Sequence, residues 1–234
     1  MPNKKIAVMQ PYLFPYIGYF QLINAVDVYV LYDDVQWIRG WINRHTILQN
    51  GEETKVTLAV DKHGSRDLIN QVSFTSNPEL KADYLNKIAN AYRHAPYFKE
   101  TFSLIEDVVN YDNRNVPKLI EYSLRHLNAR LGITTELLFS SDIDYNRDVN
   151  AQSKIIDITQ KLNGETYINN INGQHLYNRE DFAAQNLTLK FLEKEIEAYP
   201  QFGKEFVPFL SIIDVLMFND VDTVKNMVTK GKLV

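Results

Sequence analysis

Runs of apolar residues separated by polar turns divide the chain into strands and helices, and the N-terminal part already shows their order. Residues 6–9 are apolar and end at Gln10, which is followed by a proline-containing loop. Gly18 begins a short helix that reaches about Ala25, and residues 28–32 are rich in β-forming side chains. A strand, a helix and a second strand predict a βαβ unit with parallel strands and a right-handed crossover.

The middle of the chain predicts a hairpin followed by helices. Residues 44–48 and 53–60 flank an Asn-Gly turn, which is typical of an antiparallel pair. Residues 69–74 have the composition of a short edge strand. Apolar residues then recur at helical spacing over 79–131, after a Ser-Asn-Pro-Glu sequence that favours a helix start.

The alternation of strands and helices returns after this helical stretch. The pattern predicts a strand over 134–140, a helix over 150–162, a strand over 165–169, a helix over 179–185, a strand over 187–193, and helices over 210–218 and 221–228. Alternating strands and helices favour a parallel sheet. We therefore predict a three-layer α/β fold with a mostly parallel, twisted, Rossmann-like sheet. It forms a single domain over 1–234, with a helical insertion at about 77–132 and a C-terminal helical segment at about 208–230.

Composition limits the class of protein. A hydrophobic fraction of 45% is enough for a substantial core, and a formal net charge of −4 offers no basic excess for binding nucleic acid. The absence of cysteine excludes disulfides, thiolate metal sites and cysteine nucleophiles. No apolar run reaches the ~20 residues of a membrane helix, and the first residues lead into a strand instead of a signal-peptide core. We expect a soluble, cytoplasmic protein without a membrane span.

Several motifs along the chain resemble those of one known family. They are Q-P-x3-P-x2-G-Y-F at 10–20, D-D-V-Q at 33–36, Y-R-H-A-P-Y-F at 92–98, N-G-Q-H-L-Y at 172–177 and P-F-L-S-I-I-D-V-L-M-F-N at 208–219. In this combination the chain resembles the WbqC-like family over essentially its whole length. The resemblance implies a place in gene clusters for bacterial surface polysaccharides and O-antigens. It also implies a transferase role, such as acyl or aminoacyl (glycine) transfer to a nucleotide-linked sugar.

Ligands of parallel α/β sheets bind outside the carboxyl ends of the strands, so the residues after each strand are the first candidates for a site. After the first strand, the predicted substrate-binding residues are Gln10, Tyr12, Tyr16, Gly18 and Tyr19. Free N–H groups at a helix start suit an anion, and tyrosines suit a sugar or a base. The layout is similar to that of nucleotidyltransferases, but residues 16–19 lack the histidines of those enzymes. The alternative is that this loop only packs over the sheet.

Asp33 and Asp34 end the second strand and are the strongest chemical candidates. Adjacent carboxylates repel each other, so one of them requires a cation, a hydrogen-bond donor or a proton. We predict catalytic roles for both, as a general base or as acceptors for a sugar hydroxyl or amine. Binding of Mg²⁺ or Mn²⁺ has less support because the spacing is not D-x-D, and no other cofactor is indicated. The structural alternative is a pair that caps the following turn.

Further polar residues follow this pair. Gln36, Asn43 and Arg44 are predicted to bind substrate. Arg44 is either a salt-bridge partner of the acids or a bidentate hydrogen-bond donor to a phosphate or carboxylate. His94 and His175 lie in the family-like motifs, and either can act as a general base; we predict His94 as catalytic. A lone histidine is more often structural, and the histidines lack the i, i+4 spacing of a zinc site.

Asn172, Gln174 and Tyr177 follow the strand at 165–169 and complete the predicted substrate-binding set. In a parallel sheet they share an edge with Gln10 and Asp33, although a polar turn has the same composition. We predict a transferase that binds a nucleotide-linked sugar in one crevice. The alternatives are a non-catalytic sugar- or nucleotide-binding scaffold and a nucleotidyl or glycosyl transferase. The apolar face over 210–218 is either core or a homodimer contact.

Overall fold

The computed structural model describes residues 3–203 and 205–234, in which six strands form one sheet and two form a separate hairpin. The sheet order is β5-β2-β1-β6-β7-β8. Its strands are β1 (Lys5–Met9), β2 (Val28–Leu31), β5 (Glu136–Phe139), β6 (Thr166–Asn170), β7 (Thr188–Glu193) and β8 (Lys232–Leu233). Every neighbouring pair is parallel except β7 and β8. The predicted mostly parallel sheet is confirmed.

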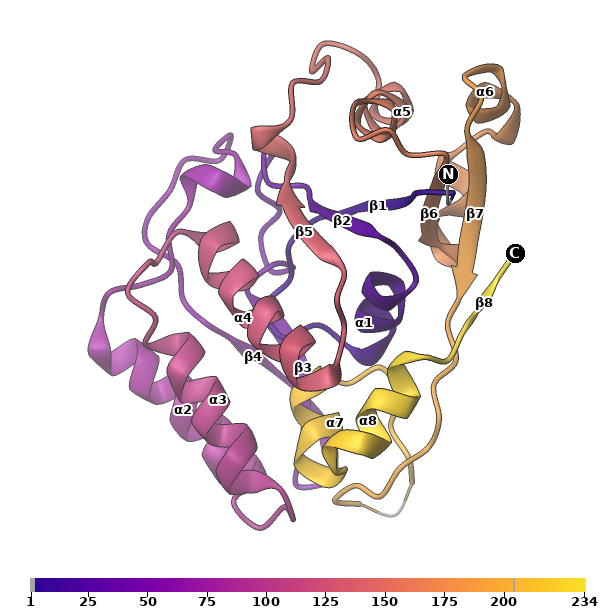
Figure 1. The fold of residues 1–234 in the computed structure, drawn as a ribbon. Coiled ribbons are helices and arrows are strands. Elements are labelled where there is room, and N and C mark those ends of the chain that lie inside the picture. The colour runs from indigo at the N-terminus through magenta and orange to yellow at the C-terminus, as the bar shows by residue number, and fades with distance from the viewer. Residues whose placement is uncertain (1–2, 204) are drawn as a thin grey trace.

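Helices cover both faces of this sheet and make a three-layer α/β fold (Figure 1). The helices are α1 (Ile17–Asn24), α2 (Pro78–Tyr92), α3 (Phe98–Val109), α4 (Val116–Leu131), α5 (Ala151–Lys161), α6 (Arg179–Ala184), α7 (Ile212–Phe218) and α8 (Val221–Val228). On β1, Ile6 and Val8 pack in one apolar cluster with α5 and α6, whereas Ala7 belongs to the cluster with α1, α4 and α8. Each face has its own core because successive side chains of a strand point to opposite faces.

The larger core continues beyond the sheet to the hairpin and the helices next to it. The hairpin pairs β3 (Arg44–Gln49) with β4 (Glu52–Thr57), as predicted, and packs against α2. The Asn77 side chain accepts a hydrogen bond from the Glu79 amide, so α2 begins where its capping sequence predicts. Gly132, at φ 72°, ends α4 in the left-handed conformation that glycine adopts at little cost.

The edge strand predicted over residues 69–74 is wrong. Ile69–Gln71 is a 3₁₀ helix, because the Gln71 side chain accepts a hydrogen bond from the Leu68 amide and closes the turn. The Ile69 and Asn70 amides donate to the carbonyls of Val35 and Asp33. This segment therefore anchors the stretch that follows β2 and does not form a continuous ladder.

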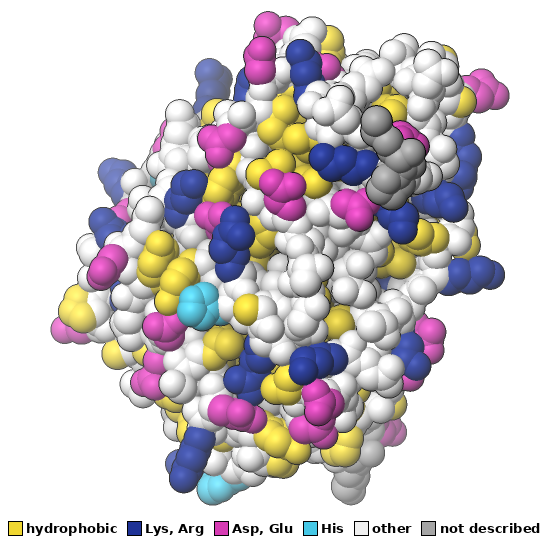
Figure 2. All heavy atoms as spheres, in the orientation of Figure 1, with side chains coloured by type: hydrophobic (Ala, Val, Ile, Leu, Met, Phe, Trp, Pro, Cys, Tyr) yellow, Lys and Arg dark blue, Asp and Glu magenta, His cyan; other side chains and the backbone are white. Residues whose placement is uncertain are grey.

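Acidic and basic side chains are interspersed with hydrophobic ones over the face shown in Figure 2. Two further 3₁₀ helices follow strands, Ser140–Asp142 after β5 and Ile171–Leu176 after β6. Within the described part of the chain, no helix has both the length and the apolar character needed to cross a membrane.

Candidate functional site

A crevice lies at the carboxyl ends of β1 and β6. It has a volume of about 630 Å³ and is continuous with a smaller pocket of about 330 Å³, because Met9, Tyr12, Tyr16, Trp41 and Asn170 line both. Residues that follow parallel strands therefore meet at one edge of the sheet, as the topology requires. We call these two joined spaces the crevice.

The loop after β1 forms one wall of the crevice and is pinned from both sides. Gln10 lines the crevice, and its carbonyl accepts a hydrogen bond from the Tyr19 hydroxyl at 2.8 Å. The Phe14 backbone has φ 45°, a strained value for a bulky residue. The Ser211 hydroxyl donates to the Phe14 carbonyl at 2.7 Å, and this contact helps to hold the strained loop in place.

Tyr12 and Tyr16 present aromatic surface to the crevice, and Gly18 makes room for one of them. A Cβ atom at Gly18 would overlap Cε2 of Tyr16, so a larger residue would displace that ring. Burial raises the pKa of Tyr16 to about 12, which keeps its hydroxyl protonated. Tyr19 lies deeper, packed edge-on against Tyr29. The loop after β1 thus forms an aromatic wall of the crevice, in which the Gln10 carbonyl already engages the Tyr19 hydroxyl.

Amide side chains after β6 form the opposite wall. The Asn169 amide nitrogen donates to the hydroxyls of Tyr167 at 2.8 Å and Tyr177 at 3.0 Å. Asn170 Oδ1 is buried and has no hydrogen-bond partner within residues 3–203 and 205–234. A buried acceptor without a partner is costly, so this oxygen is suited to a hydroxyl or N–H of a ligand. Asn172 and His175 also line the crevice.

Lys194 is a crevice residue that the sequence predictions missed. It follows β7 directly, and its Nζ lies 5.3 Å from the ring centre of Tyr16 and 5.6 Å from that of Phe209. Burial lowers the pKa of its amine. Across the described residues, no carboxylate lies within 4.0 Å of this amine. Its place immediately after a predicted parallel strand was a usable signal.

The buried carboxylate of Asp214 anchors the segment that contains Phe209, which lies over the crevice. Asp214 accepts hydrogen bonds from the hydroxyls of Tyr92 at 2.6 Å and Tyr199 at 2.7 Å, and from the Gln201 amide at 2.9 Å. Burial raises the pKa of Asp214. Phe209 itself is 56% exposed with φ 63°, so an aromatic ring stands at the rim on strained backbone.

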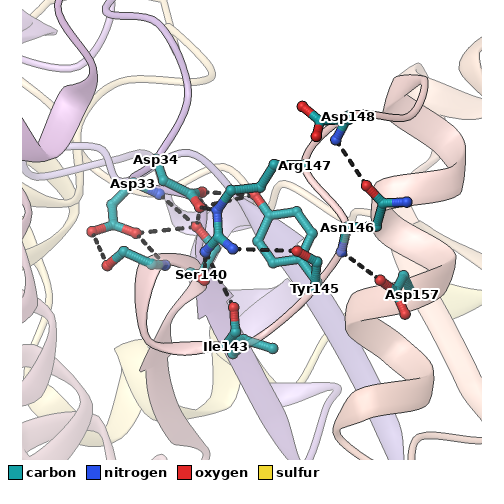
Figure 3. Close-up of polar contacts among 10 residues, drawn as sticks. Asp33, Asp34, Ser140, Ile143, Tyr145, Asn146, Arg147, Asp148 and Asp157 are labelled. Carbon is teal, nitrogen blue, oxygen red and sulfur yellow. Dashed lines mark hydrogen bonds and ion pairs between the residues drawn. The ribbon is translucent and has the colours of Figure 1, made fainter.

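Asp33 and Asp34 do not line the crevice, because their oxygens bind the segment after β5 (Figure 3). Asp33 accepts hydrogen bonds from the amide of Ser141 at 3.0 Å and from its hydroxyl at 2.8 Å. Asp34 accepts hydrogen bonds from the Tyr145 hydroxyl at 2.9 Å and from Nε of Arg147 at 2.8 Å. These contacts position residues 140–147, and the catalytic roles of both acids stay predictions.

A divalent cation does not fit this pair, since hydroxyl, amide and guanidinium donors already occupy the carboxylates. Among residues 3–203 and 205–234, no group of three or more His, Asp and Glu side chains gathers around a common point for a metal.

The other predicted residues fall in different places. Arg44 lines the smaller pocket of the crevice, whereas Asn43 is buried and donates to the Leu58 carbonyl at 2.9 Å. Gln36 is exposed and donates to the Ser65 carbonyl at 3.0 Å. His94 is exposed beside Arg93. The predicted residues that the crevice brings together are Gln10, Tyr12, Tyr16, Tyr19, Arg44, Asn172 and Tyr177. Those outside it are Gly18, Asp33, Asp34, Gln36, Asn43, His94 and Gln174.

The fold and the crevice define a three-layer α/β protein with an aromatic and amide-lined hollow at the carboxyl ends of its strands. The chain belongs to the WbqC-like protein family, whose family model matches residues 10–226. It is 25% identical over 220 residues to the protein described as "Uncharacterized protein Rv1507c" of Mycobacterium tuberculosis (strain ATCC 25618 / H37Rv). That match covers 92% of this chain and 94% of the relative. No solved structure matches the chain.

Proposed function

We propose that this protein is a transferase that binds a nucleotide-linked sugar in the crevice and transfers an acyl or aminoacyl group to it during assembly of a bacterial surface polysaccharide. The observation that carries the proposal is that three kinds of group line the crevice together. The aromatic faces of Tyr12, Tyr16 and Trp41, the unpartnered Asn170 oxygen and the Lys194 amine all line it. Aromatic faces stack on sugars and bases, the amide oxygen accepts from a hydroxyl, and the amine attracts a diphosphate.

The volume of the crevice supports a ligand of this size. About 630 Å³ lies within the range of small-molecule sites, roughly 300–1,000 Å³. Arg44 lines the smaller pocket and adds a second cation for an anionic group. The pathway part of the proposal rests on the resemblance to the WbqC-like family, whose model matches residues 10–226.

His175 takes the role of general base in this proposal, because it lines the crevice and Asp33, Asp34 and His94 do not. With a thioester donor, the sugar hydroxyl or amine forms a bond to the acyl carbonyl carbon and passes its proton to His175. The bond from that carbon to sulfur breaks, and the leaving thiolate takes the proton from His175. An imidazole ring can accept a proton and return it, so one histidine can serve both steps.

The test measures binding and turnover separately. A uridine-diphosphate sugar is titrated into the protein, and turnover is assayed with an acyl or aminoacyl thioester. Lys194→Gln is expected to weaken binding about tenfold, whereas Lys190→Gln, a matched change at an exposed position on β7, leaves it unchanged. His175→Gln is expected to remove turnover with binding retained. Failure of the wild-type protein to bind any nucleotide sugar would overturn the proposal.

The second candidate is a non-catalytic sugar- or nucleotide-binding protein of the same pathway. It is favoured by the full engagement of Asp33 and Asp34, which leaves no free carboxylate from this pair in the crevice. Saturable binding to the wild-type protein with no turnover of any thioester would select this candidate.

A further inference from the structure

A second hollow lies beside the crevice, between the loop after β2 and the segment that follows β4. Its volume is about 610 Å³, and its lining includes Trp37, Arg39 and Lys62. Arg44 lines both this hollow and the smaller pocket of the crevice, so the two spaces share one wall. We call this space the basic hollow.

Cationic side chains dominate the basic hollow. Arg39, Arg44 and Lys62 line it, and within residues 3–203 and 205–234 none of them has a carboxylate within 4.0 Å. The acid that lines the hollow, Asp61, is paired with Nη1 of Arg114 at 2.7 Å. The lining therefore carries uncompensated positive charge, although the whole chain has a net charge of −4.

The Arg44 side chain is held in one orientation. Its Nε donates to the Thr57 hydroxyl at 3.0 Å, which fixes one edge of the guanidinium. A Cβ at position 40 would lie 3.1 Å from Nη1, and Gly40 has φ 79°. Glycine thus allows the loop to pass close under the guanidinium and leaves the terminal nitrogens for a ligand.

A buried acceptor provides an independent observation. Asn43 is 6% exposed and lines the basic hollow; its Nδ2 donates to the Leu58 carbonyl. Its Oδ1 has no hydrogen-bond partner in the part of the chain that the structure describes. The bond from Nδ2 assigns the amide orientation, so the orphaned atom is the acceptor. A donor from a ligand would remove the cost of this unmet acceptor.

We propose that the basic hollow is a second ligand site, which binds the oxyanion of a small hydroxyl-bearing molecule. Arg39, Arg44 and Lys62 bind the phosphate or carboxylate oxygens, since guanidinium and ammonium groups are the donors that oxyanions prefer. Asn43 Oδ1 accepts from a hydroxyl next to the anion. Arg44 also lines the smaller pocket of the crevice, but Arg39, Lys62 and Asn43 line only the basic hollow, so the second site is proposed whichever ligand the crevice binds.

The two tryptophans of the chain allow the two sites to be observed separately. Trp37 lines the basic hollow and Trp41 lines the crevice. Inorganic phosphate and acetate are titrated separately into ¹⁵N-labelled full-length protein at constant ionic strength, and the indole N–H signals are followed. A saturable shift of the Trp37 signal is expected with at least one of them. Phosphate alone would indicate a phosphorylated ligand, and a response to acetate a carboxylate ligand.

Paired variants decide whether the named cations are responsible. Arg39→Gln with Lys62→Gln removes two positive charges and is expected to weaken the anion response of Trp37 about tenfold. Arg66→Gln, an exposed position in the same segment that does not line the hollow, is expected to retain it. Unchanged affinity in the double variant, equal loss in Arg66→Gln, or no saturable Trp37 shift in the wild-type protein would overturn the proposal.

The same spectra separate this proposal from the proposed function. A nucleotide sugar bound in the crevice shifts the Trp41 signal, whereas phosphate or acetate in the basic hollow shifts that of Trp37. An anion response at Trp37 with no sugar response at Trp41 would keep the second site and remove the proposed function. The opposite pattern would remove only the second site.

Discussion

His45 is a buried ionisable residue whose environment favours the neutral ring. It lies on β3 and is 7% exposed, with the rings of Phe14 and Tyr84 packed edge-on against it. Its Nε2 is 3.3 Å from the Tyr84 hydroxyl. Burial lowers the pKa of His45 to about 3, because an imidazolium in this site would lose its hydration.

This pKa shift predicts that the protein loses stability in mild acid. The unfolded chain binds a proton at His45 near pH 6.5, whereas the folded protein does so only near pH 3, so the free energy of unfolding falls as the pH drops between these values. By pH 4 the loss from this residue is about 3 kcal/mol. Urea unfolding at pH 7 and at pH 4 measures this loss in the free energy of unfolding. His45→Gln should show a smaller pH dependence, and His126→Gln, an exposed control, should match the wild-type slope.

The connection between β2 and the segment after β5 depends on acidic side chains that are distant in sequence from their partners. The Asp34 side chain is 6% exposed and pairs with Arg147, which is 42% exposed. Tyr145 donates to the same carboxylate, and the Arg147 guanidinium lies over the Tyr145 ring at 4.2 Å. Figure 3 shows these groups converging from two loops.

Removing the charge of Asp34 should destabilise this connection. Asp34→Asn weakens the hydrogen bonds from Tyr145 and Arg147, at a cost of about 2 kcal/mol after allowance for the exposure of Arg147. For a chain of this size we expect a melting temperature about 4–8 °C lower. Asp148→Asn, an exposed change in the same loop, is the control and should leave it unchanged. An unchanged melting temperature with lost turnover would instead support the catalytic role predicted from the sequence.

Periodicity was sufficient to predict most of the elements and much of the crevice, but not the 3₁₀ helix at Ile69–Gln71 or the short strand β8. The parallel order requires the residues after β1 and β6 to share an edge, so Gln10, Tyr12 and Tyr177 were predictable as neighbours. Trp41 and Phe209 were not predictable, because they come from loops whose path depends on packing against the hairpin and α7. The Asp33 and Asp34 contacts were missed for the same reason: their partners lie more than a hundred positions away along the chain.

The contacts of Asp33 and Asp34 also show that a polar motif at a strand end has more than one interpretation. D-D-V-Q was predicted to face the ligand, but a carboxylate pair at a strand end can equally bind the neighbouring strand's loop. The donors to Asp33 and Asp34 come from residues 140–147, and neither acid lines the crevice. Lys194 shows the opposite situation: it follows a strand and lines the crevice, and among the described residues no carboxylate lies within 4.0 Å of its amine.

Buried tyrosines are a property of the whole molecule. The chain has 14 tyrosines, and Tyr19, Tyr29, Tyr84, Tyr92 and Tyr167 are among its largest fully buried side chains. Burial raises the pKa of each of these phenols above its ordinary value. They are spread over both cores, so their ionisation reports on the integrity of the entire fold.

The folded protein should therefore resist tyrosine ionisation and lose stability at high pH. Phenols of the unfolded chain release protons near pH 10, while those of the folded protein retain them, so the free energy of unfolding falls as the pH rises above about 10. Absorbance at 295 nm, followed from pH 9 to pH 12, should show only the exposed phenols ionising at first. The buried set should follow in a slower phase that coincides with loss of far-ultraviolet circular dichroism. In concentrated guanidinium chloride all tyrosines should titrate together near pH 10. If the folded protein shows the same single titration while its circular dichroism stays unchanged, the burial of these side chains is contradicted.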